Sequence, residues 1–299
     1  MKKPDLEDIA AFIGPYRVTD GKGFRLDEHD PSSTGSLTKE DKDDAQQALK
    51  SGVEWLAEEQ AKLYAQDQWA LLLVFQARDA AGKDSTIKHV MSGVNPQGCV
   101  VTPFKQPSRE ELDHDFLWRH HAHIPARGQI GIFNRSYYED VLVVRVHDEL
   151  LAGQKLHPSL IDGEFWRKRL DDINNFERYL SNNGITIVKF FLNVSKEEQK
   201  QRFLERLDRP EKHWKFDDSD VRERRFWDDY TVAYEAAIRA TATDHAPWYV
   251  VPADKKWFTR LVVAAVTVDA MARLGADYPK IDAERRRELD AARKELLGE

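Results

Sequence analysis

The chain of 299 residues is long enough for one large domain or two smaller ones, and its hydrophobic fraction of 41% allows a sizeable core. The formal net charge of −7 argues against a general nucleic-acid-binding protein, so any site for a polyanion must be a local concentration of basic residues. The single cysteine, Cys99, excludes an internal disulfide, which suits a reducing cytoplasm.

The start of the chain and its apolar runs indicate where the protein resides. Residues 1–10 are charged and lack the apolar segment of a signal peptide. The longest apolar runs, 69–75 and 261–266, are far shorter than the roughly 18 residues that span a bilayer. We therefore expect a cytoplasmic protein with neither a membrane nor a nucleic acid as its partner.

The N-terminal region predicts an irregular arm followed by one long helix. Prolines, glycines and serines interrupt residues 1–37. Thr38 and Asp41 resemble a capping box, with Asp in place of Glu. An apolar stripe behind them predicts a helix of about 28 residues that ends at Ala65. We expect this helix to flank a sheet.

Residues 69–75 are continuously apolar, which is typical of a central parallel strand buried on both faces. Four further strands are predicted at about 100–104, 129–133, 186–192 and 248–251. The predicted helices lie at 108–123, at 164–183, from 195 onward, at about 220–242, at 255–274 and at 281–297. Capping boxes at Ser108/Glu111 and Ser195/Glu198 support two of them, and Gly184 stands at the C′ position of a third.

Strands that alternate with helices predict an α/β three-layer fold with about five mostly parallel strands. We divide the chain into an N-terminal arm and helix at 1–66, a core at 67–280 and a C-terminal helix at 281–299. Ligands of such sheets bind beyond the C-terminal ends of the strands. We therefore look for chemistry at those ends.

The loop after strand 69–75 predicts a phosphate site. Its Gly82-Lys83 stands between a strand and a helix, so that backbone N–H groups, the helix N-terminus and a lysine face an anion. The strict GxxxxGK[ST] pattern fails at Ala77 and Asp84. Asp79 lies inside the loop and would repel phosphate unless a cation lay between them, so we infer that it faces Mg²⁺. The alternative is a plain strand–helix turn in which Asp79 or Asp84 caps the helix.

A second polar element follows strand 129–133. Asn134 stands where a Walker-B acid is usual and would be a weaker metal ligand, which shifts more of the metal binding to Asp79. Arg135 can bind phosphate oxygens bidentately. The alternative is a strand-end turn with a surface arginine.

A third element, residues 196–225, holds ten basic residues and nine acidic ones in an acidic chain. Arg202, Arg206 and Arg209 lie at i, i+4 and i+7, so we expect them to share one helix face. With Lys212 and Lys215 they predict a lid, at about 195–225, that closes over phosphates. The alternative is a solvated helix with salt bridges.

The histidines at 114, 120, 121 and 123 have no partner at a familiar metal-ligand spacing, so we interpret them as structural or surface residues. Cys99 lies beside a predicted strand and is interpreted as a core residue.

Several short motifs occur together in this chain. They are Arg78-Asp79-Ala80-Ala81-Gly82-Lys83, Thr86-Ile87-Lys88, residues 131–138 (Gly-Ile-Phe-Asn-Arg-Ser-Tyr-Tyr), Trp214-Lys215-Phe216 and residues 246–254 (Ala-Pro-Trp-Tyr-Val-Val-Pro-Ala-Asp). In combination they resemble the second polyphosphate kinase family, over about residues 55–274. The resemblance implies a P-loop kinase fold similar to thymidylate kinases, with a helical lid. It also implies transfer of a terminal phosphate between inorganic polyphosphate and nucleotides, with Mg²⁺, or Mn²⁺ in its place.

The resemblance also assigns roles to individual residues. The catalytic set is Asp79, Lys83, Asn134 and Arg135, and the metal ligands are Asp79, Asn134 and Glu139. The phosphate- and polyphosphate-binding residues are Ala80, Ala81, Gly82, Asp84, Ser85, Lys88, Arg202, Arg206, Arg209, Lys212 and Lys215. The residues expected at the acceptor nucleotide are Arg78, Tyr137, Glu139 and Arg145.

Departures from the common family pattern narrow the choice of acceptor. Asp84-Ser85, Asn134 and Glu139-Asp140 are similar to the third class of the family, which accepts nucleoside mono- and diphosphates. The resemblance therefore implies reversible phosphorylation of AMP and ADP to ADP and ATP, with GMP and GDP as further candidates. Transfer would be in-line and would need no strong base, because the attacking phosphate oxygen is already ionised.

Two other functions stay open on the sequence. An ATP-dependent nucleotide or small-molecule kinase would share the loop but ignore polyphosphate. A regulatory module, suggested by the altered positions Ala77, Asp84 and Asn134, would bind a nucleotide without turnover. The long predicted helices also favour a homo-oligomer, either a dimer or a tetramer.

Overall fold

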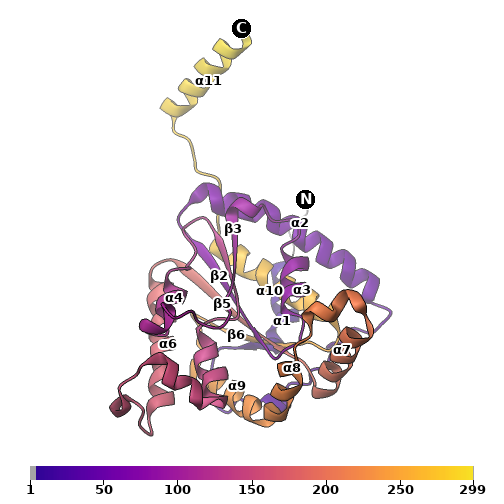
Figure 1. The fold of residues 1–299 in the computed structure, drawn as a ribbon. Coiled ribbons are helices and arrows are strands. Elements are labelled where there is room, and N and C mark those ends of the chain that lie inside the picture. Colours follow the sequence, from indigo (N-terminus) through magenta and orange to yellow (C-terminus); the bar gives the residue numbers. More distant parts are fainter. Residues whose placement is uncertain (1–4, 299) are drawn as a thin grey trace.

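A six-stranded sheet runs through the computed structural model, which describes residues 5–298 (Figure 1). The first four residues of the predicted arm and Glu299 of the predicted C-terminal helix lie outside the described residues. The strand order is β1-β6-β5-β2-β4-β3. The strands are β1 (Arg17–Val18), β2 (Ala70–Ala77), β3 (Cys99–Pro103), β4 (Ile130–Asn134), β5 (Ile185–Asn193) and β6 (Trp248–Pro252).

The five predicted strands are confirmed as β2 to β6, and they pair in parallel. Strand β2 is buried along its whole length between β4 and β5, because its continuous apolar run can face a helical layer on each side. Strand β1, a two-residue antiparallel edge strand on β6, was not predicted, because it is too short to show a hydrophobic period.

Helices cover both faces of the sheet, which confirms the predicted three-layer architecture (Figure 1). One layer contains α1 (Leu6–Ile13), α2 (Lys42–Gln66), α3 (Lys83–Val90) and α10 (Lys256–Leu274). The other is built mainly from α6 (Phe165–Asn182) and α9 (Trp227–Thr241). Since parallel strands leave no face for solvent, each layer has its own apolar core.

Shorter helices connect these layers. They are α4 (Trp118–His121), α5 (Val143–Val146), α7 (Lys196–Asp208) and α8 (Asp218–Glu223). Single 3₁₀ segments lie at Gly14–Tyr16, Leu26–Glu28, Pro96–Gly98, Glu111–Asp113, Tyr137–Val141, Asp148–Gln154, Pro158–Leu160, Pro210–Lys215 and Arg224–Phe226. Helix α11 (Ala283–Gly298) stands apart from the body at the end of a linker (Figure 1). No helix within residues 5–298 combines the length and the apolar character needed to cross a bilayer.

The prediction of one helix over 108–123 was wrong. The capping box does form, because Glu111 N–H donates to Ser108 Oγ and Ser108 N–H donates to Glu111. The 3₁₀ turn at 111–113 follows it, and the four-residue helix α4 begins only at Trp118. The carboxylate of Asp115 then accepts the N–H of Leu117, which offers the backbone a local alternative to a continuous helix.

Two other helix predictions need correction. The predicted helix at about 220–242 is divided into α8, a 3₁₀ turn and α9. Helix α2 begins only at Lys42, because the Asp41 carboxylate accepts the N–H and hydroxyl of Thr38 in a turn before the helix. By contrast, Ser195 caps α7 and Gly184, with φ of +83°, follows α6 as predicted.

Candidate functional site

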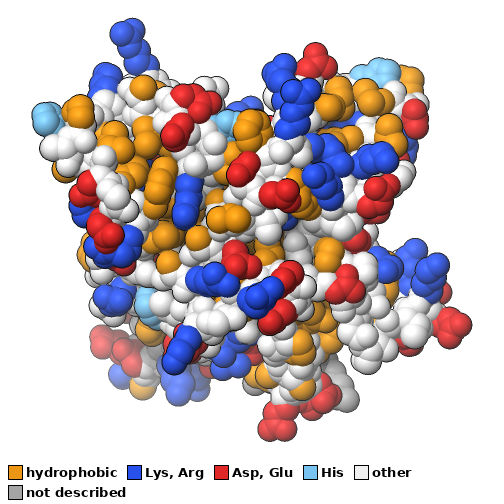
Figure 2. Space-filling view, turned by 90° about the horizontal axis from the view of Figure 1, so that it is seen from below, with side chains coloured by type: hydrophobic (Ala, Val, Ile, Leu, Met, Phe, Trp, Pro, Cys, Tyr) orange, Lys and Arg blue, Asp and Glu red, His pale blue; other side chains and the backbone are white. Residues whose placement is uncertain are grey.

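A polar cavity of about 580 Å³ opens at the C-terminal ends of β2 and β4. Its lining comes from the loop after β2, the ends of β3 and β4, helix α7, the 209–226 segment and the first turns of α10. Helices α7, α8 and α9 lie toward the bottom of Figure 1, and the face seen from below carries many Lys and Arg side chains mixed with Asp and Glu (Figure 2). The cavity therefore lies where ligands of parallel sheets bind.

The loop after β2 is folded as an anion cradle. Ala80 and Gly82 have φ of +61° and +102°, and Gly82 is the N-cap of α3. The ammonium group of Lys83 turns back and donates to the carbonyl of Ala77 at 2.8 Å. Burial, together with the charge of nearby Arg135, lowers the pKa of Lys83 to about 8. The cradle thus presents the start of a helix and a buried ammonium to the cavity.

Arg135 lies between two carboxylates, so it is not a free surface arginine. It donates to Asp79 Oδ1 at 2.8 Å and to Glu139 Oε2 at 3.0 Å. Glu139, and then Asp79, raise the pKa of the Arg135 guanidinium above its ordinary value. Its backbone φ of +65° turns the chain at the end of β4 so that the side chain reaches back to the loop. The structure therefore brings Asp79, Arg135 and Glu139 into one cluster.

Asp84, at the end of the phosphate loop, and Asn134, at the end of β4, both depart from the common P-loop pattern, and they form a hydrogen-bonded pair. The side-chain amide of Asn134 donates to Asp84 Oδ1 at 2.7 Å. An aspartate at position 134 would instead place a second carboxylate against Asp84, which is unfavourable. The two departures from the common P-loop pattern therefore compensate each other, and the carbonyl oxygen of Asn134 is left for another partner.

Arg202 supports the loop rather than the predicted lid. Its side chain is 5% exposed and pairs with Glu198 at 2.8 Å. The guanidinium donates to the carbonyls of Ala80 and Ala81 in the loop and to those of Ala253 and Asp254 after β6, at 2.7–3.0 Å. Arg202 thus joins the loop to the neighbouring strand end, and its donors are already used.

The predicted arginine row is divided by the end of α7. Helix α7 ends at Asp208, so Arg209 leaves the helix face and pairs with Glu211 at the surface. Arg209 does not line the cavity, whereas Arg206 does, with its side chain near Asp220 at 3.3 Å. Lys212 and Lys215 also line the cavity, as predicted for the basic segment.

Three further basic residues line the cavity and were not predicted from the sequence. They are Lys105, which follows β3, and Lys256 and Arg260 in the first turns of α10. Lys105 comes directly after a predicted parallel strand, and Lys256 and Arg260 lie at the start of the helix that follows another. The rule that ligands bind beyond the C-terminal strand ends could have identified them.

Three predicted site residues lie elsewhere. Tyr137 is fully buried, and its hydroxyl donates to Glu177 at 2.9 Å, so it supports the core and cannot reach a nucleotide. Arg145 lies over the ring of Trp166 at 6.0 Å and lines neither cavity of the site. Lys88 is exposed on α3 and also lies outside both cavities.

A second cavity of about 40 Å³ adjoins the first. Asp79 and Arg135 line both, and Arg78 and Glu139 line only the smaller one. Its other wall is aromatic and comes from α9, with Trp227, Tyr230 and Tyr234. Arg78 lies over the Trp227 ring at 4.1 Å, and burial lowers the pKa of its guanidinium to about 10.

The donor set suits Mg²⁺ better than a metal that needs a closed protein cage. Within residues 5–298, no group of three or more His, Cys, Asp or Glu side chains is arranged around a metal position. Mg²⁺ usually takes only one or two carboxylates and completes its shell with phosphate oxygens and water. Asp79 faces both cavities and uses Oδ1 for Arg135, so Oδ2 can face an ion. The carboxylate of Glu139 instead binds Arg135.

The surroundings of His120 and Cys99 show what these two side chains do in the fold. His120 is fully buried against Phe104, and burial lowers the pKa of its imidazole to about 3. Cys99 is half-buried against the core, and burial raises the pKa of its thiol to about 11. Both are therefore packing residues.

Comparison with known proteins gives consistent matches along most of the chain. The profile of the polyphosphate kinase 2 (PPK2) family matches residues 39–277. An ADP-polyphosphate phosphotransferase of Rhodopseudomonas palustris is 48% identical over 283 residues, which cover 92% of this chain and 98% of the relative. An AMP/ADP-polyphosphate phosphotransferase of Meiothermus ruber is 46% identical over 265 residues, 89% of this chain and 95% of the relative. The crystal structure of polyphosphate kinase 2 from Arthrobacter aurescens TC1 matches with a TM-score of 0.83 and 41% identity, over 98% of each chain.

Proposed function

The chain belongs to the polyphosphate kinase 2 family, and we propose that it transfers the terminal phosphate of inorganic polyphosphate to AMP and ADP, giving ADP and ATP reversibly. The main support for this proposal is the position of the Asp79–Arg135 pair, which lies where a large basic cavity and a small aromatic cavity meet. Such a junction suits a reaction between two phosphate-bearing substrates that approach from opposite sides. The names of the two relatives, which include ADP and AMP/ADP, support the same acceptors.

The larger cavity is proposed as the polyphosphate site. Its cations stand at the strand ends and on the 209–226 segment, so that a linear polyanion could contact several of them in turn. The basic residues that would contact polyphosphate are Lys105, Arg206, Lys212, Lys215, Lys256 and Arg260. Arg202 would support the loop without contacting the chain of phosphates, because its donors bind backbone carbonyls.

The smaller cavity is proposed as the position of the acceptor phosphate. A nucleotide would enter beside the aromatic side chains of α9, with its phosphate at Arg78 and Arg135. Glu139 would influence which nucleotide is accepted. Its carboxylate binds Arg135 from one side and so sets the direction in which the guanidinium faces the acceptor phosphate. GMP and GDP are included among the proposed acceptors.

The proposed mechanism is in-line phosphoryl transfer through positioning and charge neutralisation. A Mg²⁺ ion, with Mn²⁺ as a substitute, would neutralise phosphate charge when held by Asp79 with the Asn134 carbonyl. Lys83 and the loop N–H groups would hold the oxygens of the transferred phosphate, and Arg135 would orient Asp79. The transfer needs no general base, because the attacking phosphate oxygen is already ionised.

The test is an assay of the pure protein with AMP or ADP as acceptor, polyphosphate as donor, and Mg²⁺ or Mn²⁺. We expect ADP and ATP from AMP, and ATP from ADP. A parallel assay replaces polyphosphate with ATP and uses AMP as acceptor. The proposal would be overturned if polyphosphate gave neither ADP from AMP nor ATP from ADP, and phosphorylation of AMP by ATP but not by polyphosphate would assign an ATP-dependent kinase instead.

A further inference from the structure

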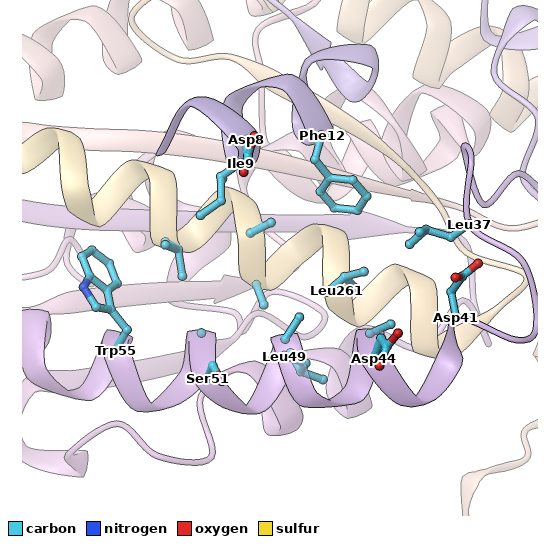
Figure 3. Close-up of a pocket in the computed structure, with 16 residues that line it drawn as sticks. Asp8, Ile9, Phe12, Leu37, Asp41, Asp44, Leu49, Ser51, Trp55 and Leu261 are labelled. Atoms are coloured by element: carbon cyan, nitrogen blue, oxygen red, sulfur yellow. The ribbon is translucent and has the colours of Figure 1, made fainter. Parts of the chain in front are cut away.

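An apolar groove lies on the helical layer formed by α1, α2 and α10 (Figure 3). Its volume is about 750 Å³, and it shares no lining residue with the two cavities of the phosphate site. Ile9, Phe12, Leu49, Trp55 and Leu261 contribute apolar surface. The acidic side chains at the groove are Asp8, Asp41 and Asp44, which Figure 3 labels. An apolar surface with an acidic rim suits an apolar helix that carries basic side chains.

Helix α11 offers a surface of that kind. Residues 281–298 are all exposed, and Leu296 and Leu297 are 68% and 77% exposed. Successive residues of a helix are about 100° apart, so Leu289, Ala292, Leu296 and Leu297 share one side. These four residues form the leucine stripe of α11.

Charges on α11 are unevenly distributed around the leucine stripe. By the same helical spacing, Arg285, Arg286 and Arg293 lie among the residues of the stripe. Asp290, next to Leu297, and Glu288, which pairs with Arg285, lie at its two edges. Glu284 and Glu295 lie on the far side of the helix, together with Arg287 and Lys294. The side of α11 that must bury its leucines therefore carries an excess of positive charge, which complements the acidic rim of the groove.

The dimensions of the helix and the groove agree. Helix α11 has 16 residues, which at 1.5 Å per residue gives a length of about 24 Å. Along α2 the groove extends from Asp41 to Trp55, a distance of about 21 Å by the same rise. The leucine stripe itself spans 289–297, about 12 Å, so it would cover about half of the groove, and the preceding turns of α11 would place arginines near the acidic residues.

We propose that α11 of one copy docks in the groove of a second copy of this chain, and that the exchange is reciprocal. The linker after Gly275 carries α11 away from the body that bears its own groove (Figure 1). Mutual exchange of one element closes a dimer with two-fold symmetry and leaves neither groove exposed. The sequence predicts a homo-oligomer, and the proposal names the surface that forms it.

The experiment is sedimentation velocity of the full-length protein over a concentration series, with paired variants. Leu296→Glu charges the stripe, and Ala291→Glu adds the same charge to the other side of α11. Ala48→Glu charges the groove on α2, and Gln47→Glu adds a charge to α2 outside it. We expect Leu296→Glu and Ala48→Glu each to raise the dimer Kd about tenfold or more, and the two controls to leave it unchanged. Polyphosphate-dependent turnover reports that all four variants are folded.

Cross-linking distinguishes a second copy from the other occupants. A variant with both Ala48→Cys and Ala292→Cys is oxidised after two differently tagged preparations are mixed, with the native chain as the Cys99-only control. Disulfides that join the two tags support the exchange. A disulfide confined to one chain, a monomeric native protein, or a dimer that Leu296→Glu leaves intact would each overturn it. Binding of the monomer to anionic vesicles through α11 would also overturn it.

Discussion

The phosphate loop at 77–85 and the basic segment at 209–226 face the same cavity, but they are held in different ways. Buried donors tie the loop down: Lys83 binds Ala77, Arg202 binds Ala80 and Ala81, and Gln199 binds the carbonyl of Asp79 at 2.9 Å. The first part of the segment, 209–215, is held largely by surface pairs such as Arg209–Glu211 and Lys212–Glu205, and its Trp214 is 78% exposed.

The difference indicates that the phosphate loop and the basic segment have different roles. A loop that is already ordered can stabilise phosphate charge without reorganising during the reaction. Exposed ion pairs contribute about 0–1 kcal/mol each, so a segment held by them can open and close at low cost. We therefore expect changes in the loop to affect turnover and stability, and changes in the segment to affect mainly the binding of polyphosphate.

The largest expected effect is that of Asp79→Asn. The change removes the carboxylate charge at the junction of the two cavities and keeps the size of the side chain. We expect kcat to fall by about 100- to 1,000-fold, because the variant would no longer hold the Mg²⁺ ion that is proposed to compensate the charge of the phosphates. Steady-state kinetics with ADP and polyphosphate measure this loss, and an unchanged thermal midpoint shows that the fold is intact. Near-normal turnover would contradict a role for Asp79 in the reaction.

Arg202→Ala should disturb the loop itself. It leaves four buried carbonyls and Glu198 without their charged donor, so we expect the free energy of unfolding to decrease by about 3 kcal/mol. Urea denaturation measures the decrease. Arg209→Ala is the matched control on an exposed arginine, and its expected change is within about 0.5 kcal/mol. Equal effects of the two variants would remove the distinction between loop and segment.

Lys83 should make the reaction depend on pH. Its pKa of about 8 means that the ammonium is charged below pH 8 and loses its proton as the pH rises. We therefore expect kcat/KM for polyphosphate to decline above pH 8, and to be about tenfold lower at pH 9 than its plateau near pH 7. Bound phosphate favours the charged lysine, so kcat at saturation should decline at a higher pH. A flat kcat/KM profile up to pH 9.5 would contradict this assignment.

Arg206→Ala should have the smallest effect and should act on one substrate. Arg206 lines the larger cavity only, so we expect the KM for polyphosphate to rise by about three- to tenfold, as for the loss of one half-buried charge contact. The KM for ADP should change less. Arg209→Ala, outside the cavity, should leave both KM values unchanged. An equal rise in the two KM values for Arg206→Ala would assign it to both substrates.

Local sequence patterns were enough to predict the layers of the fold and the position of the phosphate loop. Continuous apolar runs, capping residues and Gly82-Lys83 report on burial and backbone conformation within a few positions of themselves. For that reason the five parallel strands, the cap of α7 and the end of α6 could be predicted. Asp79, Lys83, Asn134 and Arg135 were selected for the same reason, since each stands at a strand end or in the loop.

The groups that these side chains contact could not be predicted, because they depend on how distant parts of the chain fold together. Arg202 and Arg209 look alike in the sequence, yet Arg202 binds a carbonyl 122 positions away, and Arg209 pairs with Glu211. Tyr137 turns into the core toward Glu177, and Lys105 and Lys256 reach the cavity from different strand ends. The apolar groove likewise combines α1 and α2 from the start of the chain with α10 near its end. The role of a long polar side chain depends on the group that it contacts. Local sequence patterns carry no information about a contact partner that lies far away in the sequence and comes near only when the chain folds.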